Sequence, residues 1–199
     1  MEGVAIGPYA AQYTQSTYAT AIGPSAGRTY HGGNAVAVGL ASGHVNYPTD
    51  YSRETTCVGS HAGYSLPQRY AVCVGVNAGS YLAGYWSINV GTNAGYSHTS
   101  NVGDNNGNYS VNVGPQAGFV DCATFTVAIG NNAGYSNSKT RATSIGDAAG
   151  FSYAGSYSVN IGYNCAYGAR NSGSAEAGRY SVNIGANAGH SNDGHFNVN

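Results

Sequence analysis

Bulky hydrophobic and small residues alternate in one short phrase that recurs along the whole chain. The phrase reads Val, Ile or Thr, then a small residue, then Val or Ile, then Gly, as in "TAIG" at Thr20, "TCVG" at Thr56 and "VNIG" at Val182. Alternation with a period of two indicates a β-strand whose two faces differ. Each phrase therefore predicts a short strand that is bulky on one face and small on the other.

The glycine that ends each phrase, here called the anchor glycine, marks a repeat of 16 residues. Seven of the ten intervals between successive anchors are 16 residues long, and the others are 20, 23 and 23. Helical repeats need about 33 to 47 residues, whereas one turn of a β-solenoid fits into 16. Like residues of successive coils would then stack about 4.8 Å apart. The anchors are Gly7, Gly23, Gly39, Gly59, Gly75, Gly91, Gly114, Gly130, Gly146, Gly162 and Gly185.

This repeat predicts an all-β fold, a parallel β-solenoid of about eleven 16-residue coils that fills residues 1–199 as a single domain. The three longer intervals predict loop insertions near residues 41–54, 97–108 and 167–179. We expect the bulky strand face to line the interior. Three residues after the anchor comes an Ala in most coils, which suits a tight inward corner, and the Gly that usually follows suits a bend with positive φ.

Composition narrows the possible partners. Charged residues make up only 8% of the chain and the formal net charge is -1. A nucleic-acid binder would need a basic face to neutralise phosphates, so we expect no nucleic-acid partner. No apolar run approaches the roughly 20 residues of a membrane span, and no signal peptide is visible, so we expect no membrane insertion.

No arrangement of reactive side chains points to catalysis. The six histidines fall at unrelated repeat offsets, and the eight acidic residues are too scattered to assign a carboxylate pair. The four cysteines form no C-x-x-C pair, which argues against a zinc site or a disulfide scaffold. We therefore predict no catalytic residue, no metal and no cofactor, and a protein that is not an enzyme. A polysaccharide-degrading tailspike remains an alternative, which loss of activity on removing one carboxylate would support.

The repeats resemble a known family. "VAIG--A" at intervals near 16 residues is similar to the head repeats of YadA-like trimeric autotransporter adhesins, and "G-NAGYS" resembles repeats of phage and viral tail-fibre proteins. The resemblance spans nearly the whole chain, from Val4 to Asn199. It implies a left-handed parallel β-roll, with three rolls packed around a threefold axis as a homotrimer. We expect no neck, coiled-coil stalk or membrane anchor of the autotransporter type within this sequence, which shows no heptad pattern.

The small strand face would allow another surface to approach closely. Given the resemblance, we expect it to form the subunit interface of the trimer. A solvated wall of a monomeric solenoid, or a regular ice-type or crystal-facing surface, remain alternatives. The interface candidates are Ala21, Ala37, Cys57, Cys73, Asn89, Asn112, Asn160 and Asn183. Cys57 and Cys73 fall in one column of adjacent coils, and packed free thiols are expected there in preference to a disulfide.

The three insertions are the expected recognition sites, because loops on a rigid scaffold often carry specificity. Together with the abundant Tyr and Asn, they could contact cell-surface carbohydrate, although ordinary solvated loops are the alternative. The receptor-contact candidates are His98, Asp104, Asn105, Asn106, Arg170, Glu176 and Arg179.

These observations predict a stiff structural fibre or adhesin segment that attaches to a host or surface, located outside the cell or on a virion. The repeat starts at Val4 and its register continues to "HFNVN" at the other end, with no cap visible. The chain is therefore expected to be part of a longer fibre, or to stack end to end on other subunits. A self-assembling extracellular filament or coat subunit is the alternative function.

Overall fold

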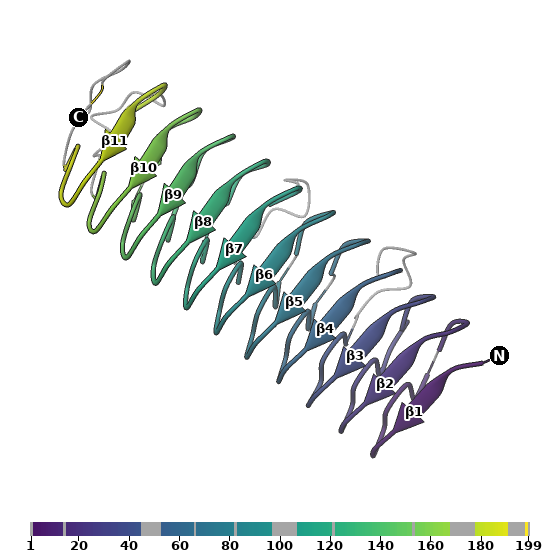
Figure 1. The fold of residues 1–199 in the computed structure, drawn as a ribbon. Helices are drawn as coiled ribbons and strands as arrows, with labels where there is room; N and C mark the ends of the chain where they lie inside the picture. Colours follow the sequence, from purple (N-terminus) through teal and green to yellow (C-terminus); the bar gives the residue numbers. More distant parts are fainter. Residues whose placement is uncertain are drawn as a thin grey trace.

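The computed structural model describes residues 2–13, 15–44, 53–65, 67–81, 83–96, 107–120, 122–152, 154–167, 178–190 and 198. In these ranges the chain is all-β and contains no helix, and each of the eleven repeated phrases is a three-residue strand (Figure 1). The strands are β1 Val4–Ile6, β2 Thr20–Ile22, β3 Val36–Val38, β4 Thr56–Val58, β5 Val72–Val74, β6 Ile88–Val90, β7 Val111–Val113, β8 Val127–Ile129, β9 Thr143–Ile145, β10 Val159–Ile161 and β11 Val182–Ile184.

The strands form one parallel sheet in which each strand pairs with the next along the sequence. The predicted register is confirmed, because equivalent residues are direct partners, as for Cys57 and Cys73 in β4 and β5. The pairing of β6 with β7 keeps this register although a longer interval separates them. The result is a parallel β-solenoid, and Figure 1 shows it as an elongated rod with one strand per coil. The predicted loop insertions fall largely on residues 45–52, 97–106 and 168–177, outside the described residues.

The two strand faces point opposite to our expectation. The central residue of β2 to β11 is buried in every case, and the flanking Val, Ile and Thr residues are half-buried or exposed. The prediction that the bulky face lines the interior is therefore wrong. Small residues fill the interior, and the β-branched side chains form the outside of the sheet.

A narrow interior explains this reversal. The predicted Ala three residues after the anchor is fully buried in most coils, as at Ala78 and Ala94, so the wall opposite the sheet also presents methyl groups. A Cβ added at Gly118 on that wall would lie 2.6 Å from Cγ of Asn112 in the sheet. Because the walls approach this closely, Val or Ile at the central strand position would be overpacked.

Close packing between successive coils requires glycine at the anchor positions. Gly91 has a φ of 130°. A Cβ on Gly91 would lie 2.6 Å from the carbonyl oxygen of Gly114 in the next coil. Non-bonded heavy atoms cannot approach so closely, and the anchors of β1 to β10 all meet the backbone of the next coil in this way, so these bends admit only glycine.

Candidate functional site

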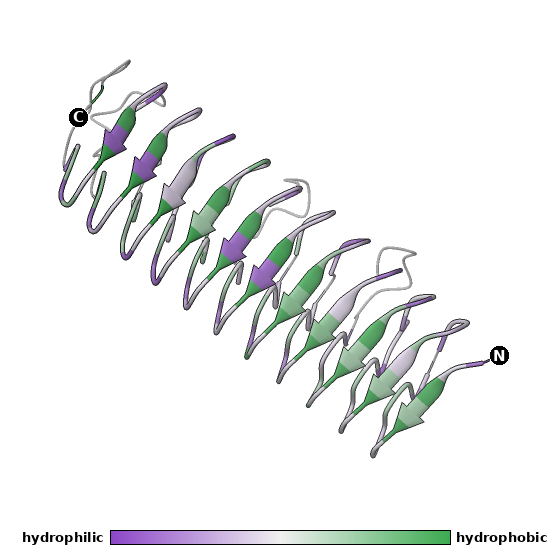
Figure 2. Ribbon diagram, viewed as in Figure 1, coloured by the Kyte–Doolittle hydropathy of each residue, from purple (hydrophilic) through white to green (hydrophobic). Residues whose placement is uncertain are grey.

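The first candidate surface is the outside of the sheet. We define the outer face as the positions one and three before each anchor glycine, which carry Val, Ile or Thr in every coil. Ile22, Ile88 and Ile129 on this face are each about two-fifths exposed in the single chain. Figure 2 shows hydrophobic colour at the flanks of most strands, paler where Thr begins β2, β4 and β9, and a polar centre in β6, β7, β10 and β11, which is the buried Asn column. A row of apolar side chains half open to water is a typical interaction surface.

A second exposed row borders the outer face. We define the corner column as the residues five before each anchor, where the chain bends with positive φ into the strand, as at Tyr70 and Trp86. Rings in adjacent coils stack here, with centroids 4.0 Å apart for Tyr70 and Trp86 and 5.0 Å apart for Tyr109 and Phe125. The ring-bearing members are Tyr18, Tyr70, Trp86, Tyr109, Phe125, Tyr157 and Tyr180.

Cationic side chains gather along the same corner. The guanidinium of Arg141 lies 5.3 Å from the ring centroids of both Phe125 and Tyr157, so it takes the place of a ring in the corner column. Arg69 lies over Tyr70 in the same way. Five of the six Lys and Arg residues within the described ranges fall five to seven residues before an anchor: Arg53, Arg69, Lys139, Arg141 and Arg179. The corner therefore carries cations interleaved with aromatic rings.

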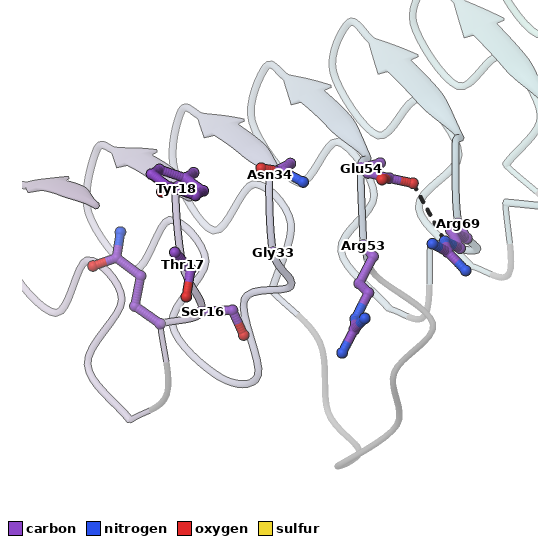
Figure 3. Close-up of a pocket in the computed structure, with 9 residues that line it drawn as sticks. Ser16, Thr17, Tyr18, Gly33, Asn34, Arg53, Glu54 and Arg69 are labelled. Carbon is purple, nitrogen blue, oxygen red and sulfur yellow. Dashed lines mark hydrogen bonds and ion pairs between the residues drawn. The ribbon is translucent and has the colours of Figure 1, made fainter. Parts of the chain in front are cut away.

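The corner column is interrupted between Tyr18 and Tyr70, and a pocket opens there (Figure 3). Its cavity volume is about 490 Å³. Gly33 and Asn34 form the coil at its middle, and the adjacent coils supply its two walls. The lining residues are Gln15, Ser16, Thr17, Tyr18, Gly33, Asn34, Arg53, Glu54 and Arg69.

Another ring ladder lies on the wall five residues after each anchor. Tyr96, Phe119, Tyr135 and Phe151 stack in sequence with centroids 4.8 to 5.1 Å apart. Tyr167 continues this stack at 4.8 Å from Phe151. Parallel bridges such as Val120 with Ser136 join the coils next to this ladder. Ring stacking and bridges hold the second wall of the rod together, so this ladder has a structural role.

The predicted subunit-interface residues lie inside the rod. Ala21, Ala37, Cys57 and Cys73 have no exposed surface, and the four asparagines of the set, Asn89, Asn112, Asn160 and Asn183, are at most 4% exposed. A side chain enclosed by its own coil cannot contact another subunit, so this assignment is corrected. The surface available for contact is the outer face, which sequence reasoning had placed inside.

The buried asparagines satisfy one another. Asn112 Nδ2 donates to Asn89 Oδ1 over 2.9 Å, and Asn183 Nδ2 donates to Asn160 Oδ1 over the same distance. Each also donates to the Ser two residues before it, as Asn89 does to Ser87 Oγ at 3.2 Å. All four asparagines of this column follow such a Ser, namely Ser87, Ser110, Ser158 and Ser181. This "SxN" pairing was the sequence signal for a buried small face.

Six of the predicted receptor contacts, His98, Asp104, Asn105, Asn106, Arg170 and Glu176, lie outside the described residues. Arg179 is described, and it belongs to the cationic corner. Its guanidinium lies 4.8 Å from the ring centroid of Tyr180 and donates to the Tyr180 hydroxyl. Sequence reasoning named Arg179 only as a loop contact and did not group the cations with the aromatic positions, although their shared offset from the anchor was a visible signal.

All four cysteines are free and buried, which confirms the packed thiols predicted at Cys57 and Cys73. A hydrogen bond with Cys73 and burial together raise the pKa of the Cys57 thiol, and burial raises that of Cys122 to about 11. Thiols in this state are poor nucleophiles. The described part of the chain also holds no cluster of three or more His, Cys, Asp or Glu side chains suited to a metal ion.

No helix in the described ranges is long and apolar enough to cross a membrane. Comparison with protein-family models, with curated proteins and with solved structures finds no match to this chain.

Proposed function

We propose that the chain is a structural segment of an attachment fibre, and that it self-associates through its outer face. The observation that carries this proposal is the half-exposed row of Val, Ile and Thr residues on eleven successive strands. A surface of this kind leaves apolar side chains in contact with water. Burial against a partner would remove this contact and is therefore favourable.

The outer face and the bordering corner column together have the dimensions of an interface. Eleven strands at about 4.8 Å spacing give a length of about 50 Å, and the three residues of each strand give a width of about 10 Å. The outer face alone is therefore about 500 Å², and the roughly 800 Å² that each partner contributes to a standard stable interface would include the corner column. A second copy presents the same columns at the same spacing, so side chains of the two surfaces can interdigitate along the full length.

The proposed assembly is a homotrimer of left-handed rolls, as the family resemblance implies, located outside the cell or on a virion. The shaft acts mechanically and not as an enzyme, and the corner and loops supply contacts with the target. Continuous ladders of backbone hydrogen bonds support the mechanical role. The backbone of each coil is hydrogen-bonded to the next, as Gly91 N is to Val74 O and Gly114 N is to Val90 O.

Substitution of Ile129 by Glu tests the interface. Ile129 is 37% exposed in the single chain, so a carboxylate there can reach water without disturbing the interior. We expect Ile129→Glu to reduce the native mass in solution from a trimer to a monomer, with an unchanged circular-dichroism spectrum. The matched control is Gln12→Glu, which adds the same charge on an exposed position away from the outer face.

A wild-type protein that is monomeric at all concentrations, or an Ile129→Glu variant that remains fully trimeric, would contradict self-association through this face. Electron micrographs of the wild-type protein distinguish a discrete trimer from the alternative of a self-assembling filament. Long filaments in place of discrete short rods would favour the filament or coat subunit that stacks end to end.

A further inference from the structure

We propose that the pocket at Gly33 and Asn34 binds one acidic sugar unit of a target polysaccharide, with Tyr18 stacking on the ring and Arg53 pairing with the carboxylate. This inference rests on the proposed attachment role and names the ligand class for it.

The pocket exists because one coil departs from the repeat at two adjacent positions. Six residues before the anchor, other coils carry side chains such as Thr17, Arg53 and Arg69, but this coil has Gly33. Five before the anchor, where rings predominate, it has Asn34. Gly33 has no side chain and Asn34 has a smaller one than the rings, so a gap opens in the corner column, and Figure 3 shows Tyr18 and Thr17 on one side of Gly33 with Arg53 and Glu54 on the other.

The gap is one rung wide. Asn34 N donates to Thr17 O, and Glu54 N donates to Gly33 O, so the three coils are direct neighbours. Walls two coils apart are about 9.6 Å apart at the strand spacing. A ligand ring between them would lie about 4.8 Å from Tyr18, which matches the 4.0 to 5.0 Å between stacked rings elsewhere in the corner column. A pyranose stacked on Tyr18 would therefore lie at the level where other coils carry a ring, next to the smaller Asn34 side chain.

The walls carry the groups that an acidic sugar needs. Tyr18 is 63% exposed and presents a ring face. Ser16, Thr17 and Asn34 offer hydroxyl and amide groups for sugar hydroxyls, and Arg53 offers a guanidinium that suits a carboxylate.

Glu54 is the acidic group in the lining, and Arg69 neutralises it through a 3.3 Å ion pair. The lining residues Arg53, Arg69 and Glu54 together carry one net positive charge. A carboxylate on the sugar suits the Arg53 guanidinium better than a hydroxyl does, because a hydrogen bond between two charged groups is stronger than one to a neutral group. A volume of about 490 Å³ lies in the range of small-molecule sites and holds one or two sugar units.

The test measures binding of sialyllactose and of digalacturonate to the assembled full chain by calorimetry, with lactose as the neutral reference. We expect at least one acidic probe to bind, and lactose to bind at least about tenfold more weakly. Arg53→Gln should lower the affinity for the acidic probe at least about tenfold and leave the affinity for lactose unchanged. The control is Arg28→Gln, which removes a cation at a different offset from the anchor, where Arg28 donates to Gln12.

Asn34→Tyr separates occupancy of the pocket from damage to the fold. Asn34 has a φ of 56°, close to the 60° of Tyr18 and 65° of Tyr70, so a tyrosine is compatible with this backbone. Its ring should stack on Tyr18 and fill the gap. We expect binding to be lost while Tm rises by about 2 °C or more, a combination that misfolding cannot produce.

The proposal is overturned if neither acidic probe binds, if Arg53→Gln or Asn34→Tyr binds like the wild type, or if uridine monophosphate binds as tightly as the sugars. The native mass is measured on the same samples. A trimer that fails to bind sugar would refute this inference alone, whereas a monomer would refute the proposed assembly.

Discussion

The side-chain amide of Asn112 donates a 2.9 Å hydrogen bond to the side-chain oxygen of Asn89, one coil earlier, inside the rod. Both residues are 1% exposed. Amides buried in this way contribute stability only while their partners are present, because an unsatisfied buried polar group costs about 1–3 kcal/mol.

Replacement of Asn112 by Ala should lower the free energy of unfolding by about 2–3 kcal/mol. The change removes the donor to Asn89 and the acceptor of the Cys122 thiol, and leaves a cavity. Urea denaturation measures the loss. The control is Asn131→Ala, since Asn131 makes the corresponding amide hydrogen bond to Asp147 on the exposed surface and should change stability by less than about 0.5 kcal/mol. Equal losses in both variants would contradict the role assigned to the buried ladder.

Replacement of Gly91 by Ala should destabilise the chain by more than about 4 kcal/mol, because the new methyl group would collide with the backbone of Gly114. Gly33→Ala is the matched control. A Cβ at Gly33 has no neighbour closer than 3.6 Å, so the expected change is within about 1 kcal/mol. Thermal denaturation of both variants checks the contrast, and a folded Gly91→Ala variant of unchanged Tm would show that the coils can separate at this bend.

Stability should fall on acidification between pH 6.5 and pH 4. His31 is buried with no hydrogen bond to either ring nitrogen, and desolvation lowers its pKa from 6.5 to about 4. In this pH window the unfolded chain binds a proton at His31 and the folded chain does not, so protonation favours unfolding. Above pH 6.5 both states are neutral at this residue and the effect vanishes.

The measurement for His31 is the free energy of unfolding in urea at pH 4.5 and at pH 7. His31→Ala should reduce the difference between the two values, because Ala occupies the equivalent inward position at Ala83 and Ala154. If the variant shows the same pH dependence as the wild type, other groups cause it.

The four thiols should resist modification in the native state. Cys57, Cys73, Cys122 and Cys165 are buried, and the pKa of Cys122 is raised to about 11, so little thiolate is present or reachable at pH 8. Titration with a thiol reagent should label fewer than one cysteine per native chain and four after unfolding in guanidinium chloride. Rapid labelling of the native protein would contradict the enclosed interior.

Sequence reasoning predicted the ladder but not its orientation. The anchors fixed the strands and their register, because only a parallel stack brings identical phrases such as those at Val72 and Ile88 into contact. Alternation alone does not say which face is inside, and the usual preference for bulky cores misled us. The width of the interior decides this, and it depends on how closely the opposite wall approaches, which no single phrase encodes.

The pocket was missed for a different reason. It arises from what Gly33 and Asn34 lack relative to other coils, and a search for recurring residues overlooks departures from the recurrence. Comparison of each column for exceptions would have found it, as it would have found Arg141 among the rings of Phe125 and Tyr157. The predicted loop contacts, in contrast, depend on segments whose conformation the repeat does not determine.

In the described part of the chain each strand contacts only the strands before and after it, so the length of the rod increases by a fixed step with each coil. Insertion or deletion of one 16-residue unit should change its reach by about 4.8 Å and leave the remaining contacts intact. Length can therefore be adjusted by duplication of coding units without redesign of a core, and the distance at which the pocket is presented to a target would change in the same fixed steps.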